Sequence, residues 1–156
     1  MDIGIAATLH ILATIVWVGG MFFAVYVLRP GTGPMAPSER LPLWGRVFAR
    51  FFPWVWAAVV LLPATGYWMI FEIYGGFAEL PVPFHVMHLV GWIMVLIFLH
   101  LWFAPYARFR RALAGDDLPA AGKELNTIRL LVTTNLYLGL FNALIGALGR
   151  YWDLGE

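Results

Sequence analysis

Four histidines lie within or at the edge of long apolar segments of the sequence: His10, His85, His88 and His100. An imidazole in hydrocarbon is costly unless it has a partner, so an ionisable residue inside a membrane marks a functional site by default. Imidazole is also a common metal ligand. We therefore treat these histidines as candidate ligands of a centre inside a membrane.

The histidines belong to the first and third of four apolar segments, which cross a bilayer in the same direction. At the rise of an α-helix, His10 lies about 10 Å along the first segment, and His85 and His88 lie within about 6 Å of the start of the third. A spacing of three also places His85 and His88 on one helix face. We expect His10 and His88 to be the axial ligands of a heme b, with His85 as the substitute ligand.

His100 is predicted to lie apart from this centre, because about 18 Å of helix separates it from His88. Met21 lies about 16 Å below His10, so His100 and Met21 form a candidate pair for a second heme. The other interpretation is that His100 is structural and hydrogen-bonds to a neighbouring helix. We expect one heme, with two as the alternative.

The composition predicts an integral membrane protein. The chain has 156 residues, of which 62% are hydrophobic and 12% are charged, whereas soluble domains carry about 25% charged residues. Residues 3–28, 47–73, 84–106 and 128–152 each reach the roughly 20 residues that a bilayer core demands. Irregular backbone cannot face lipid, so these segments must be helices. The prediction is an all-α four-helix bundle forming a single transmembrane domain over residues 1–156. The first segment lacks the basic start and the cleavage site of a signal peptide.

The basic residues predict the orientation of the bundle. All but one of the ten Lys and Arg residues lie in or beside the first and third connections, so these connections face the cytoplasm and both termini face the periplasm. The exception, Arg150, is a candidate counter-ion for outward-facing heme propionates; the alternative is an interfacial residue that snorkels. The net charge of +1 and the lack of a basic stripe give no sign of nucleic-acid binding. The absence of cysteine excludes thiolate sites.

Small and aromatic residues near His10 are candidates for contact with a macrocycle. Trp17 shares a helix stripe with His10, and Gly20 removes a side chain where either a porphyrin or another helix could approach closely. Asn135 and Asn142, seven residues apart, are predicted to hydrogen-bond between helices rather than to act as ligands.

Short motifs resemble the HemJ/CopD superfamily of small four-helix bacterial membrane proteins. His10 is followed seven residues later by Trp-Val-Gly-Gly at residues 17–20, which is similar to the first helix of that superfamily. The Phe-His-Val-Met-His motif at residues 84–88, with the basic residues 108–111, resembles its third helix. Residues 142–151 resemble the end of its fourth helix.

The resemblance implies two kinds of function. HemJ-type proteins are implicated in oxidising protoporphyrinogen and bind heme b through a first-helix histidine that matches His10. They carry a lysine on the third helix where this chain has Met87-His88, which puts that activity in doubt but favours a bis-histidine site. CopD-type proteins are linked to copper uptake or resistance.

Three functions follow as expectations. The first is a heme b redox protein of the bacterial inner membrane that exchanges electrons with an unidentified partner or lipid-soluble carrier, or that acts as an oxidoreductase on a small substrate. The second is a copper protein, in which His10, His85 and His88 bind copper and Met94, Met21 and His100 line a path inward. The third is a structural or assembly subunit without a cofactor. A homo-oligomer is compatible with all three.

Overall fold

The computed structural model describes residues 2–149, and every regular element in that range is a helix. The first rod comprises α1 (Ile3–Phe23), the wide π-helical turn η1 (Ala24–Leu28) and α2 (Arg29–Gly31). The second rod is α3 (Pro37–Tyr74). The third comprises α4 (Val82–Leu101), the π-helical turn η2 (Trp102–Tyr106) and α5 (Ala107–Ala114), and the fourth is α6 (Leu118–Gly149).

Four helices of this structure are long and apolar enough to cross a membrane, which confirms the predicted all-α membrane bundle. The four rods contain 29, 38, 33 and 32 residues. A 38-residue helix is about 57 Å long, well beyond a hydrocarbon core of about 30 Å. The rods must therefore extend past the membrane. The protein is a multi-pass membrane protein.

The predicted helix boundaries are wrong at one end of the bundle. The second and fourth helices begin at Pro37 and Leu118, ten residues before the predicted starts, and the third continues to Ala114. Hydropathy detects only the part of a helix that faces lipid, whereas the ends here are polar. Pro37 lies in the first turn of α3, where a missing N–H costs nothing.

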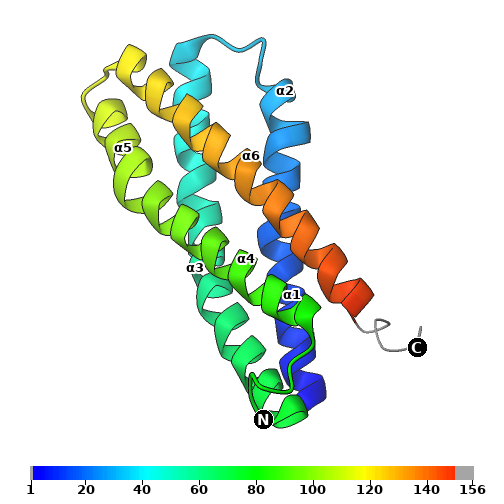
Figure 1. Cartoon of the computed structure of the whole chain (residues 1–156). Helices are drawn as coiled ribbons and strands as arrows, with labels where there is room; N and C mark the ends of the chain where they lie inside the picture. Colours follow the sequence, from blue (N-terminus) through cyan, green and yellow to red (C-terminus); the bar gives the residue numbers. More distant parts are fainter. Residues whose placement is uncertain (1, 150–156) are drawn as a thin grey trace.

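Prolines inside α3 do not interrupt it. Pro42, Pro53 and Pro63 all lie inside α3, which begins at Pro37 and continues through the three of them. Gly75 ends the helix with a φ of 67°, a left-handed conformation that glycine adopts without steric cost. The connection over residues 75–81 then leads into α4 at the opposite end from the arginines (Figure 1).

The helices are joined as two close pairs. The closest backbone packing joins α1 to α3 and α4 to α6, and α6 also lies against α1 and α3. The α2–α3 connection and the α5–α6 connection lie at the same end of the bundle (Figure 1). We call this the arginine-rich end because nine of the ten basic residues lie in or beside these two connections: Arg29, Arg40, Arg46, Arg50, Arg108, Arg110, Arg111, Lys123 and Arg129.

Two asparagines connect α6 to α4. Asn135 Nδ2 donates to the Met94 carbonyl at 3.1 Å, and Asn142 Nδ2 donates to the Met87 carbonyl at 3.0 Å. The donors and the acceptors are both seven residues apart, so the two bonds repeat along the same helix pair. The prediction that these asparagines bond between helices is confirmed.

Candidate metal centre

His10 is oriented by a side chain of α3. His10 Nδ1 lies 2.9 Å from Thr65 Oγ1, and the Thr65 hydroxyl donates to the Leu61 carbonyl at 2.6 Å. Because the single hydroxyl proton goes to Leu61, the Thr65 oxygen accepts the Nδ1–H of His10. This places the free lone pair of the imidazole on Nε2, the arrangement found in histidines that bind metals through that nitrogen.

A glycine of α3 lies beside the same ring. A Cβ at Gly66 would lie 3.5 Å from His10 Cε1, an ordinary van der Waals contact, so the backbone of α3 lies close to the imidazole. Thr65 is 2% exposed, which keeps its hydroxyl away from competing water. The histidine is therefore held by a buried acceptor and by close backbone on one side.

His88 of α4 also contacts a side chain of α3. Its Nε2 lies 3.5 Å from the Tyr67 hydroxyl, which accepts the indole N–H of Trp92 at 3.0 Å. The ring also meets Tyr67 and Phe77 edge-on, with centroids 5.3 Å away in each case. Thr65 and Tyr67 are about 3 Å apart along the helix axis. His10 and His88 thus contact residues of α3 that are two positions apart in the sequence, and axial ligation by this pair stays a prediction.

The other two histidines, His85 and His100, do not form one group with His10 and His88. His85 is exposed and lies against Phe77, with ring centroids 6.3 Å apart. Among residues 2–149, no three His, Asp or Glu side chains lie close enough to hold a metal ion. The three-histidine copper site expected from His10, His85 and His88 is therefore not formed. The i, i+3 spacing placed His85 near His88, but His85 is turned further toward the outside.

His100 and Met21 occupy different environments. His100 is exposed on the surface of α4, whereas Met21 is 2% exposed in the core. The structure does not present the two side chains to one site, so it offers no support for a second heme between them. Met21 and Met94 are instead both buried core residues.

Two other candidates contribute to helix packing. A Cβ at Gly20 would overlap the Phe51 ring of α3, so the space at this glycine is filled by a protein side chain. Trp17 is buried and meets Phe98 edge-on at 6.3 Å. The close approach expected at Gly20 is that of another helix. Arg150, the predicted propionate partner, lies outside the described residues.

The residues that sequence reasoning missed are the partners of the histidines on α3. Thr65 and Tyr67 are hydroxyl side chains within an otherwise apolar stretch, and that contrast is the signal that could have marked them. Their pairing with His10 and His88 depends on how α1 and α4 dock on α3, which no local pattern contains.

A family model for copper resistance protein D, CopD, matches residues 45–148. The chain belongs to the CopD family. This membership confirms the suspected relation to the HemJ/CopD superfamily. The CopD match contains His85, His88 and His100, and it begins after His10. No curated protein and no solved structure matches the chain significantly.

Proposed function

We propose that this CopD-family protein binds copper inside the membrane, with His10 and His88 as the first ligands. The observation that carries the proposal is the chain from His10 through Thr65 to the Leu61 carbonyl, which leaves Nε2 of His10 free for a metal. His88 lies beside Tyr67, which follows Thr65 by two residues on α3. Membership of a copper resistance family supports copper as the metal.

Buried methionines extend this ligand set toward the arginine-rich end. Met94 is six residues beyond His88, about 9 Å along α4, and its Cε lies 3.1 Å from where a Cβ of Gly139 would be, next to Val18 of α1. Met21 follows Val18 by one helical turn. Imidazole and thioether ligands together suit Cu(I). A copper ion held by the histidines would therefore find two soft ligands further along the core.

The ordinary role of these methionines is core filling, because methionine adapts to irregular gaps. Copper binding and packing make different predictions. If the thioethers only fill space, Met94→Leu keeps the volume and changes nothing in copper binding. If they receive copper from the histidines, Met94→Leu leaves binding at His10 and His88 intact and slows release or transfer of the ion.

The test is Cu(I) binding to the purified full chain in detergent, measured by competition with a chromophoric chelator and by metal analysis. We expect about one tightly bound Cu(I) per chain. His10→Ala and His88→Ala should each remove it, since no group of three metal-binding side chains is present among residues 2–149 to replace a lost ligand. His100→Ala is the matched control, because this exposed histidine should not contribute. Unchanged binding in both ligand variants would disprove the proposal.

Heme b is the second candidate, because imidazoles from two helices contact α3 at residues two positions apart, His10 at Thr65 and His88 at Tyr67. Such a pair suits the bis-histidine ligation of a low-spin electron-transfer heme, and the protein would then exchange electrons with a redox partner or a lipid-soluble carrier. The absorption spectrum of the purified protein separates the two candidates. A Soret band that shifts on dithionite reduction, and that is lost in His10→Ala, supports heme. A colourless protein that binds Cu(I) supports copper.

A further inference from the structure

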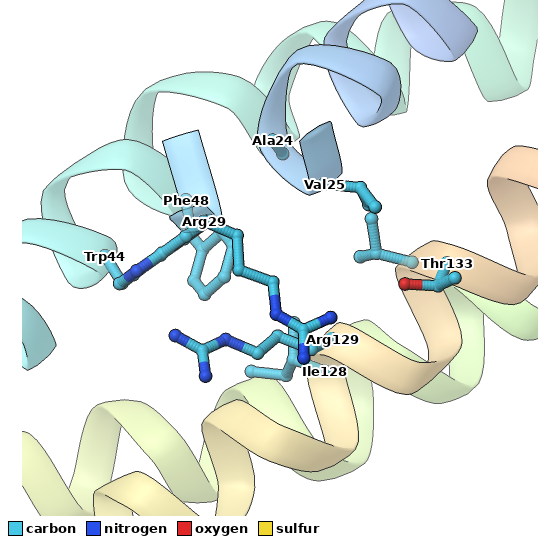
Figure 2. A pocket seen from close by; sticks show the side chains of 9 residues that line it. Ala24, Val25, Arg29, Trp44, Phe48, Ile128, Arg129 and Thr133 are labelled. Atoms are coloured by element: carbon cyan, nitrogen blue, oxygen red, sulfur yellow. The ribbon is translucent and has the colours of Figure 1, made fainter. Parts of the chain in front are cut away.

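A cleft opens at the arginine-rich end, between the first rod, the start of α3 and α6. Its volume is about 430 Å³, and three arginines from three elements line it: Arg29 of α2, Arg40 of α3 and Arg129 of α6. A smaller space lined by Arg29 and Arg129 adjoins it, and Figure 2 shows both side chains extending into this region from different helices. Three positive charges therefore converge on one cavity.

These arginines have no acidic partner within the described part of the chain. The one ion pair there joins Arg108 to Glu124, at 2.8 Å. Arg29 and Arg40 lie close enough to Arg129 to repel its charge. The Nε atoms of Arg40 and Arg129 are buried and have no hydrogen-bond partner. Arginines crowded together without an acidic partner repel one another, and an anion bound in the cleft would offset this repulsion.

The arginines are held in place by the protein rather than left free in solvent. The guanidinium of Arg129 lies over the Trp44 ring, 5.6 Å from its centroid. Trp44 is buried, and its indole N–H donates to the Thr32 hydroxyl at 3.3 Å. Arg40 donates to the Gly33 carbonyl at 3.2 Å. These contacts orient the guanidinium groups of Arg129 and Arg40 and leave their other N–H groups available to a ligand.

The remaining lining of the cleft is apolar and continues toward the membrane-crossing part of the first rod. Val25 and Tyr26 line the cleft, and Tyr26 and Val27 are about half exposed on the adjoining surface of η1. A ligand with a phosphate at one end and hydrocarbon at the other would match both parts. Guanidinium forks bind phosphate oxygens with charge-assisted hydrogen bonds.

We propose that Arg29, Arg40 and Arg129 form a binding site for the phosphate of an anionic phospholipid headgroup, with the acyl chains along η1. Basic pockets between membrane helices bind anionic headgroups in this way. The alternative within the same chemistry is a free phosphate-bearing solute. The exposed residues Arg46 and Arg50 lie at the same end but do not line the cleft, so they allow a matched comparison.

The experiment uses the full chain purified in mild detergent. Native mass spectrometry counts bound phosphatidylglycerol, phosphatidylcholine or inorganic phosphate, and thermal unfolding is followed with each of the three. We expect one phosphatidylglycerol per chain and a rise in melting temperature with that lipid alone. Arg129→Gln and Arg40→Gln should each weaken binding about tenfold, as expected for lost charge-assisted bonds. Arg46→Gln and Arg50→Gln should bind as the unmodified chain does.

A measurement without lipid separates a binding role from a structural one. Removing one of three mutually repelling charges should leave the melting temperature of Arg129→Gln unchanged or higher in lipid-free detergent. Arg129→Lys, which keeps the charge but loses the fork, should bind the lipid weakly. Equal affinity in all variants, equal binding of phosphatidylcholine, or saturation by inorganic phosphate with no lipid bound would each overturn the proposal.

Discussion

The half of the bundle that carries His10 and His88 is connected by polar side chains, whereas the arginine-rich half is filled with aromatic rings. In the histidine half, Thr65 and Tyr67 of α3 meet the two imidazoles. In the arginine-rich half, rings from α3 and from the third rod stack against each other at centroid distances of 4.8–6.3 Å: Phe48, Phe52, Trp56, Phe98, Trp102 and Tyr106.

The two halves of the bundle differ in what their side chains contribute to the protein. Large rings fill the space between α3 and the third rod at one end, where their packing holds helices that lack a hydrophobic driving force in lipid. At the other end, α3 and the third rod are connected through Tyr67 and His88, whose polar groups can bind another partner instead. We infer that the aromatic half stabilises the bundle, and the metal site that we propose above lies in the histidine half.

The largest effect is expected in the aromatic half. Phe52 is 2% exposed and meets Phe48, Phe98 and Tyr106. Phe52→Ala should lower the free energy of unfolding by about 3–5 kcal/mol, because it leaves a cavity among packed rings. Unfolding in mixed micelles measures the loss. Trp54→Ala, at a neighbouring side chain that is 64% exposed, is the control and should cost much less.

Thr65→Val should act mainly on the site. It removes the acceptor of the His10 Nδ1–H with little change in volume, so it should weaken metal binding by about 10–100-fold. It should lower the free energy of unfolding by only about 1–3 kcal/mol, the cost of a buried donor left without a partner. Chelator competition or heme retention measures the effect. Thr8→Val is the control, since Thr8 bonds only to the Gly4 carbonyl one turn before itself. Equal metal affinity in Thr65→Val and Thr8→Val would contradict an orienting role for Thr65.

The two adjacent glycines of α1 test where the rods touch. A methyl group at Gly20 would overlap the Phe51 ring, whereas nothing lies within 4 Å of the corresponding position at Gly19. Gly20→Ala should destabilise the protein by about 1–3 kcal/mol through overpacking, and Gly19→Ala should be neutral or mildly stabilising. Thermal unfolding of the two variants gives the comparison directly. A loss of metal binding in Gly20→Ala without a loss of stability would instead favour the predicted cofactor contact at this glycine.

The smallest effects are expected at the two asparagines. Asn135→Leu and Asn142→Leu each remove one hydrogen bond between α6 and α4. Polar bonds inside membranes contribute about 0.6 kcal/mol on average, so each variant should unfold only slightly more easily. A loss above about 2 kcal/mol would show that these asparagines hold α4 in place more strongly than ordinary interhelical bonds.

The sequence grouped some candidate site residues incorrectly, for a single geometric reason. Depth along a helix follows from the rise per residue, so a common depth of His10 and His88 could be predicted from the sequence, and it stays a prediction. The direction of a side chain around the helix depends on which neighbours pack beside it. His85 was therefore grouped with His88, and His100 with Met21, although His85 and His100 are both exposed.

Composition and hydropathy by themselves determined that this chain forms four membrane helices. Inside a bilayer, an apolar segment can form all its backbone hydrogen bonds within itself only as a helix. They did not determine where the helices end, since polar turns at the arginine-rich end continue them in water. Only the tertiary structure decided that Thr65 orients His10, that Phe51 fills the space at Gly20, and that three arginines from distant segments line one cleft. Each of these depends on how separate rods dock together, and docking depends on the shapes of packed side chains that no local pattern records.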